Sequence, residues 1–546
     1  MDMGDLGFWA LAHENPEHLA LVAPDGAEYT AGELLGRANQ VVHGLRGLDL
    51  KPGDRVATLL PNGVEMFEVY LAALQAGWYL VPINHHLVAP EVAYILKDSE
   101  AKAFIAHERF TDIALDAAEE AELPSSVCFG VGEITGFSSY ARMRDTQPTT
   151  DPADRTIGDV MNYTSGTTGN PKGVYRALSG LSPEEAALSQ SGILFLFGIQ
   201  PQDDNVHIVG SPLYHTAVMR FSGASIHLGH TIVVMDKWLP EEMLQLIEKY
   251  RVTTSHMVPT QFHRLLALPD DVRARYDVSS LRHMIHAAAP CPVDVKHKMI
   301  EWWGDAIDEY YAASEGGGTL VSAQEWLTKP GTVGKAWPIS EIAIFDDEGN
   351  RIEEPGVIGT VYMSMQTGDF EYHKDEKKTK SNRIGKFFTV GDVGFLDNEG
   401  YLKITDRMKD IIITAGGKNI TPSEIENQLK FSPYISDAVV IGDKRKFLSC
   451  LVMIDYENVA KYAQDNDVPF TDFASLCRAR EIVQLINDEI ERVNRDFARV
   501  ETIKQFRLID QQLTAEDDEL TPTMKLRRKF VNEKYKALID GMYASA

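Results

Sequence analysis

The stretch that decides the fold lies at residues 163–174 and reads Tyr163-Thr164-Ser165-Gly166-Thr167-Thr168-Gly169-Asn170-Pro171-Lys172-Gly173-Val174. A short run with the pattern of a strand, residues 159–163, precedes it. Glycines and small hydroxylated residues let the backbone turn tightly and present N–H groups, and such loops bind phosphate oxygens with help from a lysine. The spacing is not that of a Walker A loop, which counted from Gly166 needs glycine at 171, where proline stands. An ordinary surface loop between two strands is the alternative.

Length and composition limit the protein classes. The chain has 546 residues, too many for one core, which predicts a large domain plus a smaller one. Its 44% hydrophobic and 24% charged residues are typical of a soluble globular protein. The formal net charge of −27 disfavours a general nucleic-acid binder, which needs a broad basic surface, but leaves an anionic substrate open. The four cysteines are scattered without C-x-x-C spacing, which fits reduced thiols rather than a zinc site or disulfide framework.

No targeting or membrane segment is visible. Residues 1–5 contain no basic region ahead of an apolar one, and residues 542–546 do not form a peroxisomal signal. No window of about 18 apolar residues predicts a transmembrane helix. We therefore expect a cytoplasmic protein, with peripheral membrane contact and a homodimer both left open.

Before the loop, strand and helix patterns alternate. Thr30 and Glu33 form a capping box at the start of a helix. Residues 54–60 and 79–84 are typical of buried strands and residues 65–76 of a helix between them, with a further strand at 103–106. Strand–helix–strand order at these lengths predicts a parallel α/β layer. The adjacent His85 and His86 are expected on different sides of an extended chain, which disfavours a metal site.

Taken whole, the string S-G-T-T-G-x-P-K-G resembles the phosphate loop of the acyl-adenylate-forming superfamily, which includes acyl-CoA synthetases, adenylation domains and luciferases. The resemblance covers nearly the whole chain through six ordered elements. It implies an α/β protein whose large N-terminal domain has two α/β layers and a small β-barrel-like subdomain. This domain (1–406) is joined by a hinge (407–410), with Lys409 at the swivel position, to a mobile α+β C-terminal domain (411–546).

The resemblance also implies a nucleotide site. Residues 309–315 look like the family's Y-G-x-T-E element, with Ala312 and Ser314 replacing glycine and threonine, and Glu315 as the Mg²⁺ ligand together with Thr168. One glutamate suffices, because Mg²⁺ fills its shell with water and phosphate oxygens. Asp392 and Arg407 match ribose contacts. The implied ATP- and AMP-binding set is Thr164, Ser165, Gly166, Thr167, Thr168, Gly169, Lys172, Ala288, Ala289, Pro290, Glu309, Tyr310, Tyr311, Ala312, Ser314, Asp392, Arg407 and Lys525.

Two further subsites follow from the same resemblance. Tyr214 and His215 take the place beside the acyl carboxylate, and they supply no aspartate for an amino group, so the acid is expected to lack an α-amine. Gly416 and Gly417 are expected to line the CoA path after domain rotation, together with Lys409. The lysines between 374 and 386 form a solvated loop, or alternatively draw an acidic ligand such as CoA.

The implied reaction joins a carboxylate to ATP, giving acyl-AMP and pyrophosphate, and then transfers the acyl group to CoA. Charge neutralisation and alignment carry such catalysis, which implies catalytic roles for Lys525, Glu315, Lys172 and Thr168. The segment Leu520–Arg528 resembles long-chain fatty acyl-CoA synthetases, which points to a long or bulky apolar acid. An acyl-adenylate former that delivers to a carrier protein or to oxidation is the alternative, and a non-catalytic sensor is a third.

Overall fold

This computed structural model describes residues 6–164, 171–202, 204–313, 315–366, 370–407, 411–415, 419–511 and 528–544. The chain divides into two units, Met1–Ile342 with Met363–Phe388, and Ala343–Tyr362 with Thr389–Ala546. Among the described residues, no helix has the length and apolar character needed to cross a bilayer.

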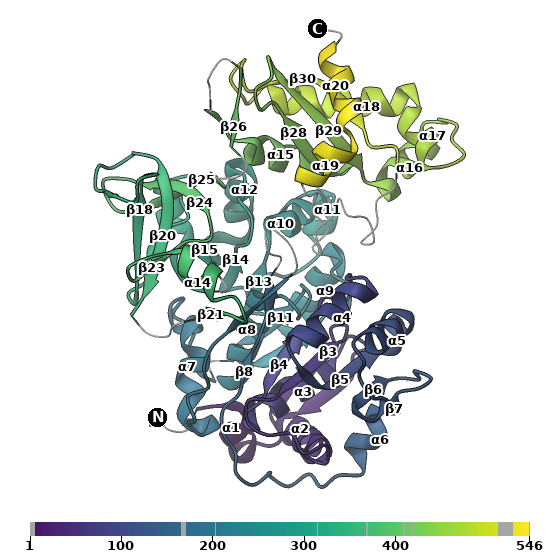
Figure 1. Ribbon diagram of the computed structural model, residues 1–546, viewed down its shortest axis with the longest axis vertical. Coiled ribbons are helices and arrows are strands. Elements are labelled where there is room, and N and C mark those ends of the chain that lie inside the picture. The colour runs from purple at the N-terminus through teal and green to yellow at the C-terminus, as the bar shows by residue number, and fades with distance from the viewer. Residues whose placement is uncertain are drawn as a thin grey trace. The chain divides into compact units, whose positions relative to one another are not determined.

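The first unit contains two large sheets (Figure 1). The six-stranded sheet is parallel throughout, in the order β7 (Ser138–Ser139), β6 (Cys128–Val131), β5 (Ala101–His107), β3 (Arg55–Leu59), β4 (Tyr79–Pro82) and β8 (Asp159–Val160). The nine-stranded sheet runs β17 (Lys335–Ala336), β16 (Gly316–Val321), β15 (Ile307–Ala313), β14 (His283–His286), β13 (Thr254–Met257), β11 (Val206–Val209), β12 (Thr231–Val234), β1 (Leu19–Val22) and β2 (Glu28–Thr30). Its strands from β15 to β1 pair in parallel.

Alternating residues explain how helices cover both faces of each sheet. In β5, Ala103 and Ile105 pack into one core, whereas Phe104 and Ala106 pack into another with α4 (Ala89–Asp98) and α5 (Thr111–Glu120). Successive side chains of a strand point to opposite faces, so one strand serves two cores. The first core also holds α2 (Ala31–Arg46), α3 (Val64–Gln75) and α8 (Thr216–His227) and one face of the nine-stranded sheet. The expected pair of α/β layers is therefore confirmed.

The remaining elements of the first unit complete these layers. The outer face of the nine-stranded sheet packs on α9 (Pro240–Tyr250), α10 (Pro259–Leu266) and α12 (Val293–Trp303). A small antiparallel sheet joins β9 (Tyr163–Thr164), β10 (Lys172–Tyr175) and β21 (Glu371–Tyr372), which leads into α14 (Glu376–Ser381). The other helices are α1 (Phe8–Glu14), α6 (Tyr140–Asp145), α7 (Pro183–Phe195), α11 (Asp270–Arg273) and α13 (Ala323–Thr328), and β22 (Arg383–Ile384) pairs with β23 (Phe387–Phe388).

The second unit contains strands of two main sheets. In the first, β18 (Ser340–Phe345) pairs with β19 (Arg351–Ile352), and β24 (Asp392–Leu396) pairs with β20 (Gly359–Met365) and β25 (Leu402–Arg407), all antiparallel. The second is the sheet of β28 (Ile435–Ile441), β29 (Leu448–Ile454) and β30 (Ile503–Leu508). The hairpin of β26 (Ile412–Ile413) and β27 (Asn419–Ile420) precedes it.

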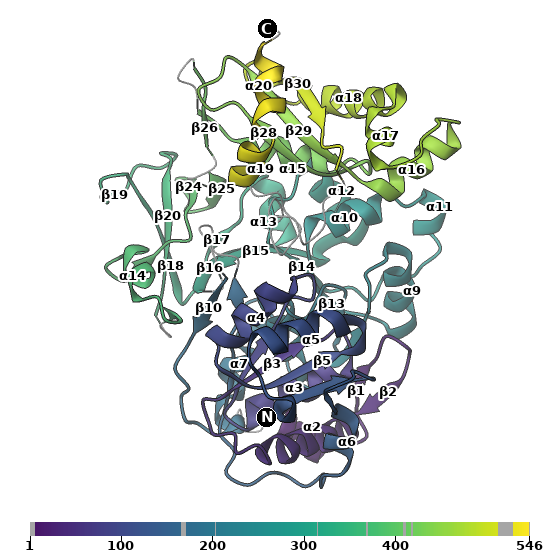
Figure 2. The same cartoon turned by 45° about the vertical axis from the view of Figure 1, so that its right-hand side comes forward.

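Helices cover both faces of the β28–β30 sheet (Figure 2). Ala438 and Val440 face α15 (Pro422–Lys430), α16 (Tyr456–Asp465), α17 (Phe473–Arg478) and α18 (Arg480–Asn494), whereas Val439 and Ile441 face α19 (Arg528–Lys534) and α20 (Lys536–Ala544). Pro422 stands in the first turn of α15. This arrangement is the small α+β domain of the expected fold class, and the predicted domain and hinge bounds stay predictions.

One expected strand is divided in the structure. Residues 159–163 form β8 and β9, because the chain leaves the six-stranded sheet after Val160 and pairs with β10 instead. Between β23 and β24, Gly391 turns the backbone with a φ of 88°. The capping box of Thr30 and Glu33 is confirmed, with both reciprocal hydrogen bonds present.

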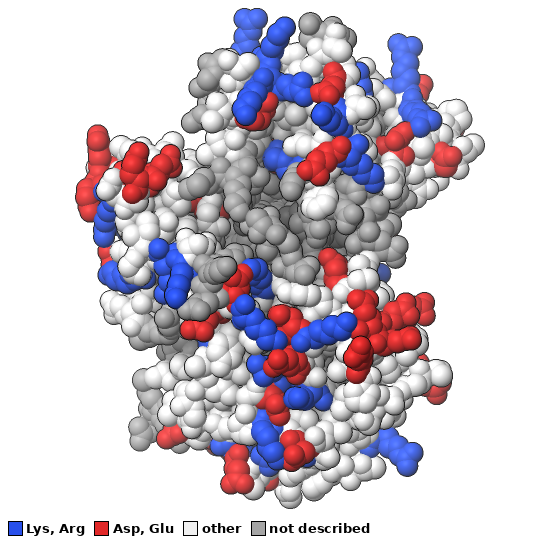
Figure 3. Space-filling view, in the orientation of Figure 1, with Lys and Arg blue, Asp and Glu red and all other residues white. Residues whose placement is uncertain are grey.

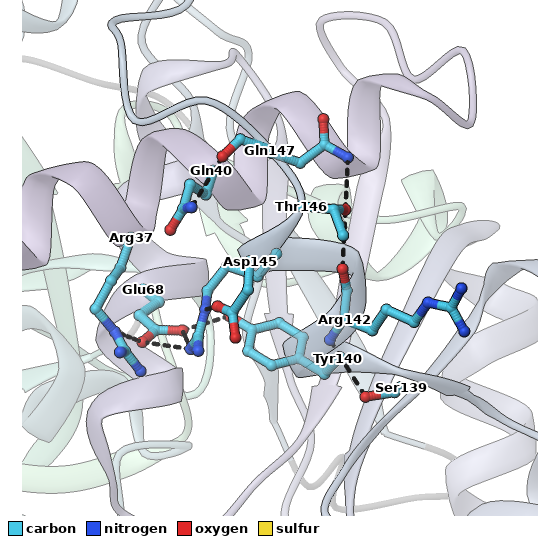
Figure 4. A network of polar contacts seen from close by, with 10 residues as sticks. Arg37, Gln40, Glu68, Ser139, Tyr140, Arg142, Asp145, Thr146 and Gln147 are labelled. Carbon is cyan, nitrogen blue, oxygen red and sulfur yellow. Dashed lines mark hydrogen bonds and ion pairs between the residues drawn. The ribbon is translucent and has the colours of Figure 1, made fainter.

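A buried ion network joins three helices of the first unit (Figure 4). The carboxylate of Glu68, on α3, has no exposed surface and accepts hydrogen bonds from Arg37 on α2 and from Arg144 and Tyr140 on α6. The Arg144 and Tyr140 bonds measure 3.0 and 2.7 Å. Removing one partner of such a network leaves uncompensated buried charge, which costs far more than losing a surface pair.

We expect Glu68→Ala to lower the free energy of unfolding by about 3 kcal/mol, because two arginines lose their buried counter-charge. Denaturant unfolding monitored by circular dichroism measures this value. Lys298→Ala removes the exposed pair with Asp294 and is expected to cost at most about 0.5 kcal/mol. Equal losses in the two variants would contradict a stabilising role for the network.

Candidate active site

The predicted phosphate loop is carried by the hairpin of β9 and β10. Lys172 stands opposite Thr164, and Gly173 opposite Tyr163. A Cβ on Gly173 would lie 2.4 Å from Met161 Cε and 3.1 Å from the Tyr163 ring, so a larger residue there would have to displace the Met161 side chain. Ser165, Gly166, Thr167, Thr168 and Gly169 lie outside the described residues, so their phosphate contacts stay a prediction.

Three other predicted segments follow parallel strands of the nine-stranded sheet. Tyr214 and His215 follow β11, Ala288–Pro290 follow β14, and Glu315 follows β15. The strand order β15-β14-β13-β11 brings their carboxyl ends to one edge. Ligands of parallel α/β sheets bind at this edge, because the connecting loops gather there. Ser314 lies outside the described residues.

The loop after β14 holds an unusual backbone conformation. Ala288 has a φ of 70°, in the left-handed region that alanine seldom adopts. Such strained positions cluster at ligand sites, where the surrounding structure holds them in place. The conformation fits the expectation that Ala288, Ala289 and Pro290 present backbone to a flat ring, and their contact with adenine stays a prediction.

The loop that carries Tyr214 and His215 is positioned by Asn62, which follows β3. Its buried amide donates 3.0 Å hydrogen bonds to the carbonyl oxygens of Ser211 and Met235 and accepts one from the Leu213 N–H at 2.8 Å. Asn62 therefore ties the edges of the two large sheets together just before Tyr214.

His85 and His86 correct an expectation. They lie in a turn, with ring centroids 4.5 Å apart, and not on opposite sides of an extended chain. The His85 ring stacks on Phe110 at 4.9 Å and meets the edge of Tyr214 at 5.1 Å. Burial, and then His86, lower the pKa of His85 to about 4, so its ring is neutral at physiological pH. Sequence reasoning did not connect His85 with Tyr214, although both follow carboxyl ends of parallel strands.

Glu309 and Tyr310 lie inside the domain. The buried Glu309 carboxylate accepts a 2.5 Å hydrogen bond from Lys296 Nζ on α12, and burial raises the pKa of Glu309. The Tyr310 hydroxyl lies 3.0 Å from His256 Nε2. The Glu309 side chain thus serves a buried ion pair, while Tyr311 and Ala312 are partly exposed. Roles of these four residues toward ATP stay predictions.

One segment of the chain contacts both charged residues expected at the pyrophosphate, Glu315 and Lys172. The Tyr372 hydroxyl donates to Glu315 Oε1 at 2.6 Å, and Lys172 forms an ion pair with Asp375. Two glycines with positive φ, Gly316 and Gly317, turn the chain directly after Glu315. The sequence did not reveal Tyr372 and Asp375 as partners of these residues. The available signal was the aromatic spacing of Phe370 and Tyr372, which is typical of a short strand.

The donor set fits a magnesium ion. Among the described residues, no three histidine, cysteine, aspartate or glutamate side chains gather as a metal-binding group. Magnesium needs no such cluster, since one or two carboxylates plus water and substrate phosphates complete its shell. Tyr372 donates to one oxygen of the Glu315 carboxylate, and a carboxylate has two oxygens that can act as ligands. Thr168, the other expected ligand, lies outside the described residues.

In the second unit, Asp392 and Arg407 stand opposite each other in the antiparallel pair β24–β25. Asp392 is 8% exposed. The two expected ribose contacts are therefore neighbours across one ladder, and their contact with ribose stays a prediction. Lys409, Gly416, Gly417 and Lys525 lie outside the described residues.

Three basic residues of the lysine-rich stretch near residue 380 contact the protein itself. Lys374 donates to the Asp98 carbonyl at 2.8 Å and pairs with Glu100 at 3.1 Å. Arg383 donates to the Phe370 carbonyl at 3.0 Å, and Lys386 pairs with Glu341 at 2.5 Å. On the face drawn in Figure 3, basic and acidic side chains are interspersed, without a broad basic surface among the coloured residues. For these three residues, the contacts disfavour a role in attracting CoA.

Comparison with known proteins identifies the family. Residues 8–367 match the model of the AMP-binding enzymes, and residues 409–546 match the model of the AMP-binding enzyme C-terminal domain. The chain therefore belongs to the AMP-binding enzymes, the acyl-adenylate-forming superfamily that the phosphate-loop string resembles.

The relatives are ligases. The chain is 31% identical over 457 residues to the long-chain-fatty-acid–CoA ligase FadD13 of Mycobacterium tuberculosis, covering 82% of this chain and 88% of that protein. It is 29% identical over 429 residues to the fatty acid–[acyl-carrier-protein] ligase ScoC of Streptomyces coeruleorubidus, covering 77% and 79%. The anthranilate CoA ligase AuaEII, solved with anthranoyl-AMP, shares the fold with a TM-score of 0.76 at 23% identity, covering 99% of this chain and all of that one.

Proposed function

We propose that this protein is an AMP-forming carboxylic acid–CoA ligase. The observation that carries the proposal is the family match over residues 8–367 and 409–546, in a chain whose phosphate hairpin and Glu315 are joined through one segment. In the first step the acid would attack the α-phosphate of ATP, releasing pyrophosphate. In the second the thiol of CoA would attack the acyl carbonyl, releasing AMP.

The first step requires charge neutralisation, because the carboxylate and the triphosphate repel one another. Lys172 and the 164–169 loop would bind the leaving pyrophosphate, and Lys525 would bridge the carboxylate and the α-phosphate. A magnesium ion held by Glu315 and Thr168 would neutralise phosphate charge. Ala288–Pro290 would face adenine, and Asp392 and Arg407 the ribose hydroxyls. Rotation at Lys409 would then bring Gly416 and Gly417 to the CoA path.

We further propose a long-chain or bulky apolar acid as substrate. The named activity of the FadD13 relative supports this class, as does the resemblance of residues 520–528 to long-chain synthetases. The rings around Tyr214 add physical support, because His85 is neutral and Phe110 is apolar. Neutral aromatic side chains contact an apolar chain without the desolvation cost that charged groups carry.

Product analysis tests the proposal. The purified protein is incubated with ATP, Mg²⁺, CoA and an acid panel from butanoate to hexadecanoate with benzoate, and thioester and AMP are measured. We expect acyl-CoA and AMP in equal amounts, with kcat/KM at least about tenfold higher for hexadecanoate than for butanoate, because each buried methylene adds affinity. A preference for butanoate would overturn the substrate class.

A second acceptor is supported by the ScoC relative, which acts on an acyl carrier protein. The same assay with a phosphopantetheine-loaded carrier protein in place of CoA distinguishes the two. If thioester formed on the carrier protein and none formed on free CoA, the acceptor would be the carrier protein and not CoA. AMP without any thioester would mean that the adenylate is delivered elsewhere.

A further inference from the structure

The segment from Phe370 to Ser381 connects the two charged groups expected at the pyrophosphate. Its strand β21 pairs with β10, the strand that begins at Lys172, with Tyr372 opposite Val174. Tyr372 reaches from this sheet to Glu315, which follows β15 in a different sheet. Asp375, three residues further on, reaches back to Lys172. One short segment therefore contacts both residues.

Internal hydrogen bonds hold Tyr372 and Asp375 in a fixed relation. The Tyr372 N–H donates to Thr379 Oγ1 at 3.0 Å, and the Asp375 N–H donates to the Tyr372 carbonyl at 3.0 Å. The Thr379 N–H and hydroxyl both donate to the Asp375 carbonyl, at 3.1 and 3.0 Å. A turn closed by four such bonds presents its two side chains as a unit.

The segment is also attached to the corner between α4 and β5. Lys374 donates to the Asp98 carbonyl and pairs with Glu100, and His373 Nε2 lies 3.1 Å from the same carbonyl. The His373 N–H donates to the Gly173 carbonyl at 2.9 Å, beside Lys172. Residues 370–381 thus contact the phosphate hairpin, the turn that carries Glu315 and the edge of the six-stranded sheet. This segment includes β21 and α14 (Figure 1).

We propose that this segment acts as a clamp on the two charged residues. Tyr372 positions Glu315 for the metal–phosphate complex, and Asp375 pairs with Lys172 until a triphosphate displaces Asp375 from the lysine. The clamp rests on the proposed function, because it presumes that Lys172 and Glu315 meet the nucleotide. Tyr372 and Asp375 are positioning residues: they act through Glu315 and Lys172.

The two contacts have different consequences for binding. Tyr372 donates to one Glu315 oxygen and so fixes the direction in which the other faces. The Lys172 and Asp375 side chains are 25% and 27% exposed, and their pairing spares Lys172 an uncompensated charge. The Asp375 charge must then be displaced when phosphates, of the same sign, arrive.

The test measures ATP binding by calorimetry without any acid substrate, once with Mg²⁺ and once with EDTA. For Tyr372→Phe we expect the Kd of ATP with Mg²⁺ to rise about fivefold and the Kd in EDTA to stay within twofold, because the hydroxyl acts through the metal ligand. For Asp375→Asn we expect the Kd of ATP in EDTA to fall about threefold, because Lys172 no longer has a competing partner.

Matched controls remove equivalent bonds elsewhere. Tyr276→Phe deletes a 2.8 Å tyrosine–carboxylate bond to Glu241, and Asp277→Asn weakens a 2.7 Å ion pair with Arg251. Neither control is expected to change either Kd.

Four results would overturn the clamp. A Tyr372→Phe variant with equal changes in Mg²⁺ and EDTA would show that the hydroxyl does not act through the metal. Weaker ATP binding by Asp375→Asn would show that the pair supports binding instead of competing with it. Unchanged Kd values in both variants, with unchanged circular dichroism, would remove both roles. Absence of ATP binding by the unmodified protein would be separate, since it would overturn the proposed function and the clamp together.

Discussion

Replacing Glu315 with glutamine is expected to reduce adenylation by about 100- to 1,000-fold, the usual effect of losing one charged group that stabilises the transition state. Glutamine keeps a carbonyl oxygen that can accept the Tyr372 hydrogen bond, so the turn after β15 is expected to keep its structure. What is lost is the negative charge that would hold Mg²⁺ on the leaving pyrophosphate. Acid-dependent exchange of labelled pyrophosphate into ATP measures this step alone.

The control for Glu315 is Glu371→Gln. Glu371 is an exposed glutamate on β21, one residue from Tyr372, so the variant removes the same charge from the same part of the domain. Its exchange rate is expected to stay within twofold. If Glu315→Gln exchanged pyrophosphate at a rate within threefold of the unmodified protein, Glu315 would not be the metal ligand.

The layers of the fold could be predicted because local patterns determine them. The alternation in β5 places Ala103 and Phe104 in different cores, and the capping box at Thr30 begins α2 as its residue types predict. The strand over 159–163 could not be divided from sequence, because its second half pairs with β10 across the phosphate loop. That division depends on which strands the two halves pair with, β4 for the first and β10 for the second, and local propensity does not include such pairing.

The candidate site was predictable only where residues cluster in sequence. The loop at 164–172 and the element at 309–315 each have a recognisable order of residue types, whereas Tyr372 and Asp375 lie about 200 residues after Lys172 within a lysine-rich stretch. Their pairing with Glu315 and Lys172 depends on the tertiary fold, as does the contact of His85 with Tyr214. Glu309 is the opposite case: it lies inside a recognisable motif, yet its side chain binds the buried Lys296.

Replacing Lys525 with alanine is expected to have the largest effect on the first step, lowering pyrophosphate exchange by about 1,000-fold. The lysine would supply the positive charge between carboxylate and α-phosphate, where the two anions must meet. The second step starts from acyl-AMP, and there the residues at 416–417 would take its place. Synthetic acyl-AMP with CoA is therefore expected to give thioester at a rate within tenfold of the unmodified protein.

The role of Lys525 is tested by comparing the loss of rate in the two half-reactions, pyrophosphate exchange and thioester formation. Arg528, the first described residue after it, donates a 2.5 Å bond to the buried carboxylate of Glu426, so the C-terminal module keeps this anchor in the variant. Lys536→Ala removes an exposed lysine from the start of α20 and is expected to leave both half-reactions unchanged. Equal loss of both half-reactions in Lys525→Ala would indicate damage to the module as a whole. An unchanged exchange rate would assign the charge at the α-phosphate to another residue.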